Sequence, residues 1–490
     1  MSEPSLPENL DVLIIGAGIS GIDAAYHLQR NRPDDSFAII EAQDDIGGTW
    51  HTHRFPGIRS DSDLFTFGFK WKPWLGVPIA TAEEIMTYLT EAVSEQDLGR
   101  HIRFNHLVTD AQWSSETQRW TVSMTQGEVQ RTIICKFLWM CAGYYRHTQG
   151  YMPEYPGRAA FEGPVIHPQS WPEGLDYTDK TVVVIGSGAT AATLVPAIAG
   201  TAAHVTMLQR SPTYFYARPQ SDDFTDTLRA LDLPDDQFHD IMRRRNLFES
   251  EKLRARALSE PDVLADELIN GARSYLGEDY DVETHFTPRY RPWEQRLAMV
   301  PEGDFFQAIA AGKASVVTGH IAEFTNTGIV LQNGETLTAD IIVSATGLVL
   351  SALGDIAFEI DGTPLDLSKS FTHRGIMFSE VPNLVNVFGY LRSSWTLRAD
   401  LVSNYVCRLL DHMETKAVHS VTPRLKPDEQ NMTPRPWIEN ENFSAGYIQR
   451  RMHLLPKQGD HEPWIMTQDY FIDRKTLPAA DLEDGTLVYS

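Results

Sequence analysis

The chain has 490 residues, and 42 Lys and Arg stand against 66 Asp and Glu, which gives a formal net charge of −24. This acidic excess argues against a nucleic acid or an anionic membrane surface as a partner, because no basic surplus exists to neutralise phosphates. A hydrophobic fraction of 42% and a charged fraction of 22% are typical of a globular protein, and the length predicts two or three domains.

The cysteines and the hydropathy exclude further classes. Cys135, Cys141 and Cys407 are the only cysteines and form no Cys-x-x-Cys pair, which excludes a disulfide scaffold, a thiolate zinc site and a dithiol redox centre. No metal-ligand cluster stands out among the 16 histidines, so no metal is expected. The N-terminal residues lack the basic start and apolar run of a signal peptide, and no apolar stretch of about 18 residues predicts a transmembrane segment. A cytoplasmic location is expected.

The first predicted unit is a strand, a glycine turn and a helix over residues 11–30. An apolar strand at 11–15 is followed by Gly16, Gly18 and Gly21, with Ser20 inside the turn. Such a turn lets a pyrophosphate approach the backbone at the N-terminus of the helix. Glu41 closes the next strand, 37–40, where an acidic side chain meets the ribose hydroxyls of a dinucleotide.

A second unit of the same kind covers residues 180–200. The strand 180–185 runs into a turn that is predicted to bind a second dinucleotide through Gly186, Ser187, Gly188, Ala189, Thr190 and Ala191. The strand that follows, 204–209, ends at Arg210 instead of an acid, and Ser211 comes next. A guanidinium grips a 2′-phosphate where a carboxylate would repel it, so this site is predicted to prefer NADPH over NADH. The plainer alternative, a surface arginine without a ligand, stays open.

Two dinucleotide sites in one chain indicate electron transfer between two cofactors, most commonly a flavin in the first and a nicotinamide in the second. The predicted fold is α/β, with two Rossmann-like dinucleotide-binding domains, for FAD and NADPH, and a helical insertion in the NADPH domain. The insertion is indicated by dense charge and sparse glycine between about 220 and 285. The expected parts are FAD-binding 1–148, NADPH-binding 149–219, the insertion 220–287, NADPH-binding 288–374 and FAD-binding 375–490.

Several motifs give the chain a family resemblance. Gly-Gly-Thr-Trp occupies 47–50, Arg-Phe-Pro-Gly-Ile-Arg-Ser-Asp occupies 54–61, and the spacing F-x-G-x-x-x-H-x-x-x-W-P runs from Phe161 to Pro172. Together they resemble the class B flavin monooxygenases, specifically the type I Baeyer–Villiger group. Residues 59–63, 208–213, 292–296 and 394–397 bring the chain nearest to the ethionamide-activating monooxygenases. The resemblance spans nearly the whole chain.

The resemblance implies a two-stage reaction. NADPH reduces FAD, the reduced flavin adds O₂ to give a C4a-peroxide, and the peroxide attacks a ketone to give an ester or lactone, with sulfoxidation of a thioether as a side activity. One alternative uses the same cofactors mainly for S- or N-oxygenation of thioethers, thioamides or amines. Another is a flavin- and NADPH-binding redox sensor or oxidase that transfers no oxygen.

The resemblance also assigns residues. Arg296, after Pro-Trp-Glu-Gln, matches the family's catalytic arginine, and Asp61 matches the acid that holds this arginine against the flavin. Arginine suits an anionic oxygen species because it stays charged and donates along a planar fork. A plain ion pair at Arg296 and a turn-forming role for Asp61 are the alternatives. Asp63 is expected to be structural. His167, on the connector between the domains, is expected to have a structural or conformational role, with direct chemistry as the alternative.

Further contacts are implied by the same matches. Thr49 and Trp50 are expected along the flavin, Val108 beside the adenine and Arg59 beside the nicotinamide dinucleotide; Trp50 is equally compatible with core packing. Gln295 stands where many relatives have a lysine that holds the 2′-phosphate, which places more of the NADPH selectivity on Arg210 and Ser211. The sequence assigns no role to Trp464.

Overall fold

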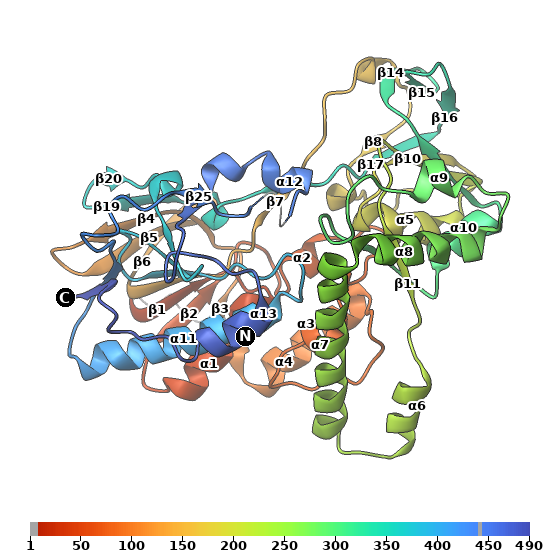
Figure 1. The fold of residues 1–490 in the computed structure, drawn as a ribbon. Helices are drawn as coiled ribbons and strands as arrows, with labels where there is room; N and C mark the ends of the chain where they lie inside the picture. The colour runs from red at the N-terminus through yellow and green to blue at the C-terminus, as the bar shows by residue number, and fades with distance from the viewer. Residues whose placement is uncertain (1–7, 440–442) are drawn as a thin grey trace.

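The computed structural model describes residues 8–439 and 443–490, which form two α/β units joined by crossing segments (Figure 1). The first unit is built on a nine-stranded sheet with the order β20-β19-β4-β5-β6-β1-β2-β3, and β23 also pairs with β6. β1 (Asn9–Ile15) lies parallel to β2 (Phe37–Ile40) and to β6 (Val129–Met140). The central strands are buried on both faces, which explains their unbroken Val and Ile runs.

Helices cover this sheet. α1 (Ile19–Asn31) packs beside α11 (Thr396–Thr415), and α4 (Ala82–Glu95) completes the same layer. The remaining strands of the sheet are β3 (Ile102–Arg103), β4 (Leu107–Ser114), β5 (Arg119–Gln126), β19 (Ala357–Ile360), β20 (Thr363–Pro364) and β23 (Leu384–Asn386).

The second unit holds a five-stranded parallel sheet with the order β13-β10-β9-β17-β8. Its centre is β9 (Thr181–Ile185), and α5 (Ala189–Ala199) follows that strand directly. Both units therefore repeat the predicted strand, glycine turn and helix, and the predicted two-Rossmann α/β fold is confirmed. The other strands are β8 (Val165–Ile166), β10 (His204–Gln209), β13 (Ala314–Thr318) and β17 (Ile341–Ser344), with α10 (Asp304–Ala310) packed against α5.

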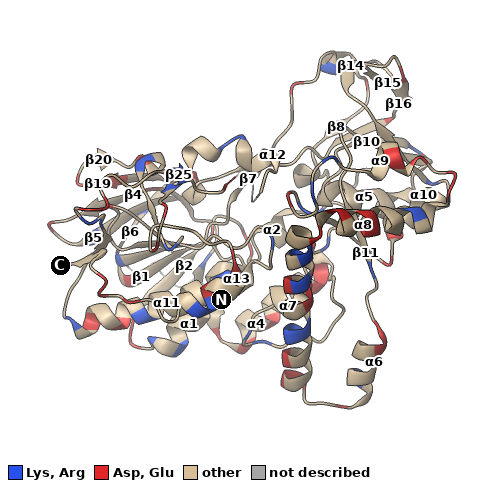
Figure 2. Ribbon diagram, in the orientation of Figure 1, with Lys and Arg blue, Asp and Glu red and all other residues tan. Residues whose placement is uncertain are grey.

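Residues 223–286 are helical. They form α6 (Asp223–Ala230), α7 (Asp235–Ser259), α8 (Pro261–Leu276) and α9 (Val282–Phe286), and the long α7 carries alternating basic and acidic turns (Figure 2). α7 also contacts the first unit: Arg243 Nη1 donates to the carbonyls of Phe65 at 2.8 Å and Gly68 at 3.1 Å. These helices therefore bridge the two units instead of standing on one.

The chain crosses between the units along two adjacent segments. β7 (Tyr145–Gly150) pairs antiparallel with β18 (Leu348–Leu350). His167 Nε2 lies 2.9 Å from the carbonyl of Gly347, and its Nδ1 accepts the amide of Gln169. A Cβ on Gly150 would lie 2.0 Å from the imidazole, so the ring is packed directly on that backbone. These contacts indicate that His167 holds the two crossing segments together.

Short elements complete the described chain. They are α2 (Thr49–Thr52), α3 (Leu64–Phe67), α12 (Gly446–Gln449), α13 (Tyr470–Thr476), β11 (Phe215–Arg218), β12 (Ala298–Pro301), β14 (Ile321–Thr325), β15 (Gly328–Leu331), β16 (Thr336–Thr338), β21 (Thr372–His373), β22 (Met377–Phe378), β24 (Val421–Pro423), β25 (Arg435–Pro436), β26 (Lys457–Gln458) and β27 (Leu487–Tyr489). Among the helices of residues 8–439 and 443–490, none combines the length and apolarity needed to cross a membrane.

Candidate active site

A cavity of about 640 Å³ lies where the two units meet. Its walls include the turn after β1, the segment 40–62, the end of β6, the start of α5 and Arg296. Of the predicted site residues, the cavity brings together Gly16, Gly18, Ser20, Glu41, Thr49, Trp50, Arg59, Asp61, Val108, Ala189, Thr190 and Arg296.

The turn after β1 is shaped for close approach of a ligand. Gly16 has φ +103°, and a Cβ there would lie 2.6 Å from the carbonyl oxygen of Cys141. A Cβ on Gly21 would lie 1.9 Å from the Gly16 carbonyl oxygen, so Gly21 serves helix packing, not the cavity. Gly18 meets nothing closer than 3.8 Å and begins α1 without a side-chain cap. The free N–H groups of α1 therefore face the cavity and fit a pyrophosphate.

Glu41 lies at the end of β2 next to this turn. Its carboxylate accepts the amides of Ala17 at 2.7 Å and Gln43 at 2.9 Å. Burial raises the pKa of Glu41, although these backbone hydrogen bonds act in the opposite direction. The acid is thereby fixed in the wall beside Val108 at the start of β4, an arrangement that fits a ribose and its adenine.

Arg296 and Asp61 form an ion pair on the cavity wall, in which Nη1 of Arg296 donates to Oδ2 of Asp61. The side chains of Arg296 and Asp61 are 30% and 31% exposed, respectively, and Nε of Arg296 is buried and has no hydrogen-bond partner among the residues that the structure describes. Burial disfavours the charged form of Arg296, but the Asp61 carboxylate and nearby tyrosines outweigh it, so the pKa lies well above its usual value. A permanent cation thus faces the cavity. Asp63, by contrast, caps α3 through the amide and hydroxyl of Thr66, as expected of a structural residue.

Tyrosines surround Arg296, and the sequence analysis did not identify them. Tyr144 and Tyr145 line the cavity directly after β6, and the Tyr145 hydroxyl donates to that of Tyr144. Burial raises the pKa of both phenols, which keeps them protonated. The ring centroids of Tyr447 and Tyr145 are 5.9 Å apart, and the buried Tyr447 hydroxyl has no hydrogen-bond partner within residues 8–439 and 443–490. The rule that sites form at the carboxyl ends of parallel strands could have identified the Tyr-Tyr pair.

Trp395 and the segment after α2 supply further walls. Trp395 stacks on Tyr144 with ring centroids 4.9 Å apart, and its Nε1 donates to Ser20 Oγ at 2.8 Å. Trp50 lines the cavity and also packs on Phe67, with ring centroids 5.7 Å apart; its contact with a flavin stays a prediction. Burial, together with the nearby charges of His147 and His167, lowers the pKa of the cavity-lining His53 to about 4, which keeps it neutral.

Arg59 lies at the junction of the units. It pairs with Asp304 at the start of α10, with Nη1 and Oδ2 2.5 Å apart and Nη2 and Oδ1 3.2 Å apart. Because Arg59 also lines the cavity, this pair ties the 54–63 loop of the first unit to the second.

The second glycine turn lies mostly outside this cavity. Gly186 has φ +130°, and its Cβ would lie 2.3 Å from the Ala345 carbonyl oxygen, whereas nothing lies within 4 Å of a Cβ on Gly188. α5 begins at this turn without a side-chain cap, and Ala191 is buried against the sheet. Ser187 Oγ reaches Thr213 Oγ1 at 2.8 Å, and Arg210 and Ser211 are exposed at the end of β10. The surface fits a diphosphate and a further phosphate.

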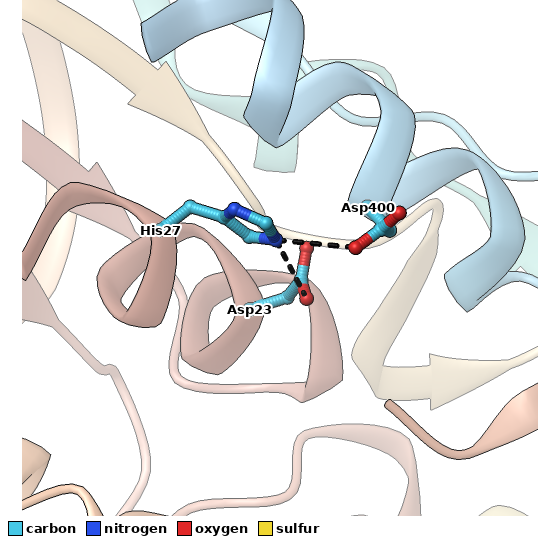
Figure 3. Close-up of side chains that lie close together, drawn as sticks. All are labelled: Asp23, His27 and Asp400. Carbon is cyan, nitrogen blue, oxygen red and sulfur yellow. Dashed lines mark hydrogen bonds and ion pairs between the residues drawn. The ribbon is translucent and has the colours of Figure 1, made fainter. Parts of the chain in front are cut away.

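One group in the described residues could hold a metal ion: Asp23, His27 and Asp400, between α1 and α11 (Figure 3). His27 Nε2 lies 3.2 Å from Asp400 Oδ1 and 3.7 Å from Asp23 Oδ1. Asp23 also accepts Trp71 Nε1 at 3.1 Å and Ser403 Oγ at 2.8 Å. Hydrogen bonds within the protein thus account for these side chains. Trp464 is likewise structural, since it is fully buried and donates to Glu429 at 3.0 Å.

Two dinucleotide-shaped turns, one inside the cavity and one at its edge, together with a fixed cation on the cavity wall define the class of two-domain flavin and nicotinamide oxidoreductases. The chain matches the family described as flavin-binding monooxygenase-like over residues 78–353, and that of the NAD(P)-binding Rossmann-like domain over residues 14–73. The chain belongs to the flavin-binding monooxygenase-like family.

Similar proteins and solved structures support this family assignment. The chain is 44% identical to the FAD-containing monooxygenase EthA of Mycolicibacterium smegmatis over 487 residues, 99% of this chain and 98% of that protein. It is 44% identical to the probable FAD-binding monooxygenase AlmA of Acinetobacter baylyi over 485 residues, 98% of this chain and 96% of that protein. Among solved structures, a steroid monooxygenase bound to NADP matches with a TM-score of 0.76 and 21% identity, covering 98% of this chain and 99% of that one. The predicted resemblance to class B flavin monooxygenases and to the ethionamide-activating subgroup is confirmed, and so is the enzyme class, a flavin monooxygenase.

Proposed function

We propose that the protein is an FAD- and NADPH-dependent Baeyer–Villiger monooxygenase that inserts one oxygen atom of O₂ beside a ketone carbonyl, giving an ester or lactone. When bound, the flavin supplies the activated oxygen after reduction by NADPH. The observation that carries the proposal is the Arg296–Asp61 pair on the cavity wall. FAD binding is supported by the uncapped α1 and by Glu41, and NADPH binding by the uncapped α5 and by Arg210.

Arg296 would stabilise negative charge that develops on oxygen during the reaction. Asp61 holds one side of the guanidinium, and Nε has no partner in the described part of the chain, which leaves it available as a donor. A fixed donor of this kind reorganises little when charge develops, and its removal costs about 2.7–4 kcal/mol of transition-state stabilisation. Apolar walls such as Phe55, Ile58 and Phe67 limit access of water to the same space.

A second function, S- or N-oxygenation of thioethers, thioamides or amines, is favoured by Tyr144 and Tyr145. Both phenols stay protonated and line the cavity. A proton donor beside the reacting oxygen assists electrophilic transfer to sulfur or nitrogen. Sulfoxidation as a side activity is therefore expected.

The test incubates the purified protein with NADPH, O₂, a panel of ketones and one thioether, and identifies products by mass. We expect an ester or lactone, with some sulfoxide. Arg296→Ala should keep its flavin absorbance and lose product formation by about 10²–10³-fold, whereas Arg296→Lys should retain part of it. Sulfoxide without ester from any ketone would favour the second function; hydrogen peroxide alone would contradict both. Unchanged ester formation in Arg296→Ala would refute the assigned role.

A further inference from the structure

The hydroxyl of Tyr144 carries a hydrogen that no residue of the described chain accepts. The hydroxyl of Tyr145 donates to it, which occupies a lone pair of Tyr144 and leaves its own hydrogen unused. The Tyr144 hydroxyl donates to no residue in 8–439 or 443–490. Tyr144 is 8% exposed and lines the cavity. Since a buried donor without an acceptor costs about 1–3 kcal/mol, we expect its acceptor to be a ligand in the cavity.

The ring of Tyr144 is held in place by other aromatic side chains. It stacks on Trp395, with ring centroids 4.9 Å apart and an angle of 9° between the planes, and its centroid lies 5.3 Å from that of Phe388. Trp395 is fixed in turn by the hydrogen bond from its Nε1 to Ser20 Oγ at 2.8 Å. The amide of Ser351 donates to the Tyr144 carbonyl at 2.9 Å. The position of the phenol is therefore set before a ligand binds, which lowers the entropic cost of the interaction.

One set of contacts connects Trp395 with the Arg296–Asp61 ion pair. Ser394, directly before Trp395, shares a hydrogen bond of 2.6 Å between its Oγ and Thr66 Oγ1. Thr66 lies in α3, five residues after Asp61. The stacked rings therefore lie against the segment that carries Asp61.

A second set of contacts connects Tyr144 with the segment that carries Arg296. The ring centroid of Tyr447 lies 6.5 Å from that of Tyr144. Ser444, three residues before Tyr447, donates its amide to the carbonyl of Glu294 at 3.1 Å. Glu294 is two residues before Arg296. Because Tyr144 and Arg296 also line the same cavity, their donors are available to one ligand.

Tyr145 strengthens the free donor of Tyr144. A hydroxyl that accepts a hydrogen bond donates its own hydrogen more strongly, because each bond polarises the next. The ring centroids of Tyr144 and Tyr145 are 3.8 Å apart, and the Tyr145 hydroxyl makes no other hydrogen bond within the part of the chain that the structure describes. Burial raises the pKa of Tyr144, so its hydroxyl keeps the hydrogen. The two phenols thus form a hydrogen-bonded pair that ends in one free donor.

We propose that the Tyr144 hydroxyl donates a hydrogen bond to the carbonyl oxygen of the ketone substrate. When the attacking oxygen bonds to the carbonyl carbon, the π electron pair of the carbonyl moves onto its oxygen, and Tyr144 and Arg296 stabilise that charge together. Tyr144 is then a catalytic residue, and Tyr145 is a positioning residue that acts through it. The inference rests on the proposed Baeyer–Villiger function for the development of charge, but not for the binding of a ketone carbonyl.

The experiment has a spectroscopic arm and a kinetic arm. The infrared C=O band of acetophenone, labelled with ¹³C at the carbonyl, is recorded on the FAD-loaded enzyme without NADPH. The variants are Tyr144→Phe, which keeps the ring that stacks on Trp395, Tyr145→Phe and the double variant. Tyr26→Phe is the control, because it removes a phenol hydroxyl that lies outside the cavity and accepts from Arg30 at 3.4 Å. The kinetic arm measures kcat and KM for ester formation and the rate of sulfoxidation of a thioether. Flavin content and the melting temperature show whether each variant is folded.

We expect the C=O band of the bound ketone at a lower wavenumber in the wild type than in Tyr144→Phe. The kcat for ester formation should fall by about tenfold to a hundredfold in Tyr144→Phe, as for loss of one hydrogen bond to a charged group. KM should change less, because the bond strengthens as charge develops. Tyr145→Phe should have a smaller effect, and the double variant should match Tyr144→Phe, since Tyr145 acts through Tyr144. Tyr26→Phe should match the wild type.

A bound C=O band that is absent, or that is the same in the wild type and Tyr144→Phe, would overturn the proposal. Loss of flavin from Tyr144→Phe would also overturn it, as would loss of sulfoxide formation with unchanged ester formation. Losses that add in the double variant would contradict the role of Tyr145. A band that depends on Tyr144, in an enzyme that forms no ester, would support the carbonyl site and contradict the proposed function.

Discussion

The two glycine turns follow the same plan but meet very different surroundings. The first, at 16–21, lies inside the cavity, and Glu41, Trp395 and the end of β6 enclose it. The second, at 186–191, contributes only Ala189 and Thr190 to that cavity, and its arginine at 210 is exposed. The same strand, glycine turn and helix therefore present an enclosed surface at the first turn and an open surface at the second. The difference lies in what surrounds each turn, not in the motif.

The largest expected effect compares Gly16→Ala with Gly188→Ala. An alanine at Gly16 meets a carbonyl oxygen at 2.6 Å with φ at +103°, which costs roughly 2–5 kcal/mol in strain and overpacking. We expect loss of flavin and a lower melting temperature, measured by absorbance and calorimetry. An alanine at Gly188 has open space and a φ of −79°, so flavin should stay and only the affinity for NADPH should fall. Equal flavin loss in both variants would contradict the proposed difference between the two glycine turns.

A smaller effect is expected at Arg210. Arg210→Gln should raise KM for NADPH by about tenfold to a hundredfold, because a hydrogen bond to a charged group contributes roughly 1.5–3 kcal/mol. KM for NADH and the flavin content should not change. Lys180→Gln is the control, since Lys180 is exposed at the opposite end of the same sheet, before β9. If KM for NADPH does not change in Arg210→Gln, then Arg210 is a surface residue without a ligand.

The smallest effect on stability is expected for the cluster of Asp23, His27 and Asp400 between α1 and α11. Burial disfavours the imidazolium of His27, but Asp400 and Asp23 outweigh it and raise its pKa; burial raises the pKa of Asp23 to about 6. A raised histidine pKa contributes stability below the unfolded value, and this stability is lost as the pH rises through the folded value. Above pH 6, unfolding free energy should therefore fall with pH in the wild type, and the slope should flatten in His27→Gln, which loses about 1 kcal/mol at pH 6. Denaturant titrations at several pH values measure the unfolding free energy and its slope with pH. Equal slopes in the wild type and His27→Gln would contradict the raised pKa of His27.

The local sequence predicted the strands and helices of the two units better than it predicted the residues that line the cavity. Unbroken Val and Ile runs followed by glycine turns identify a parallel strand and its helix within about 20 residues, and Arg296 and Asp61 were found through family motifs. Tyr144 and Tyr145 were missed, since only the pairing of β6 with β1 brings them beside the first turn. Trp395 reaches Ser20 across 375 residues of sequence.

The paired crossing of β7 and β18, fastened by His167 to the carbonyl of Gly347, has a mechanical consequence. Two antiparallel strands that share hydrogen bonds resist separation along their length more strongly than they resist twisting. Relative movement of the units should thus be a swivel about this ribbon, and not a translation that parts them. Such a swivel would move the two glycine turns relative to each other and would stretch the Arg59–Asp304 ion pair that links the units.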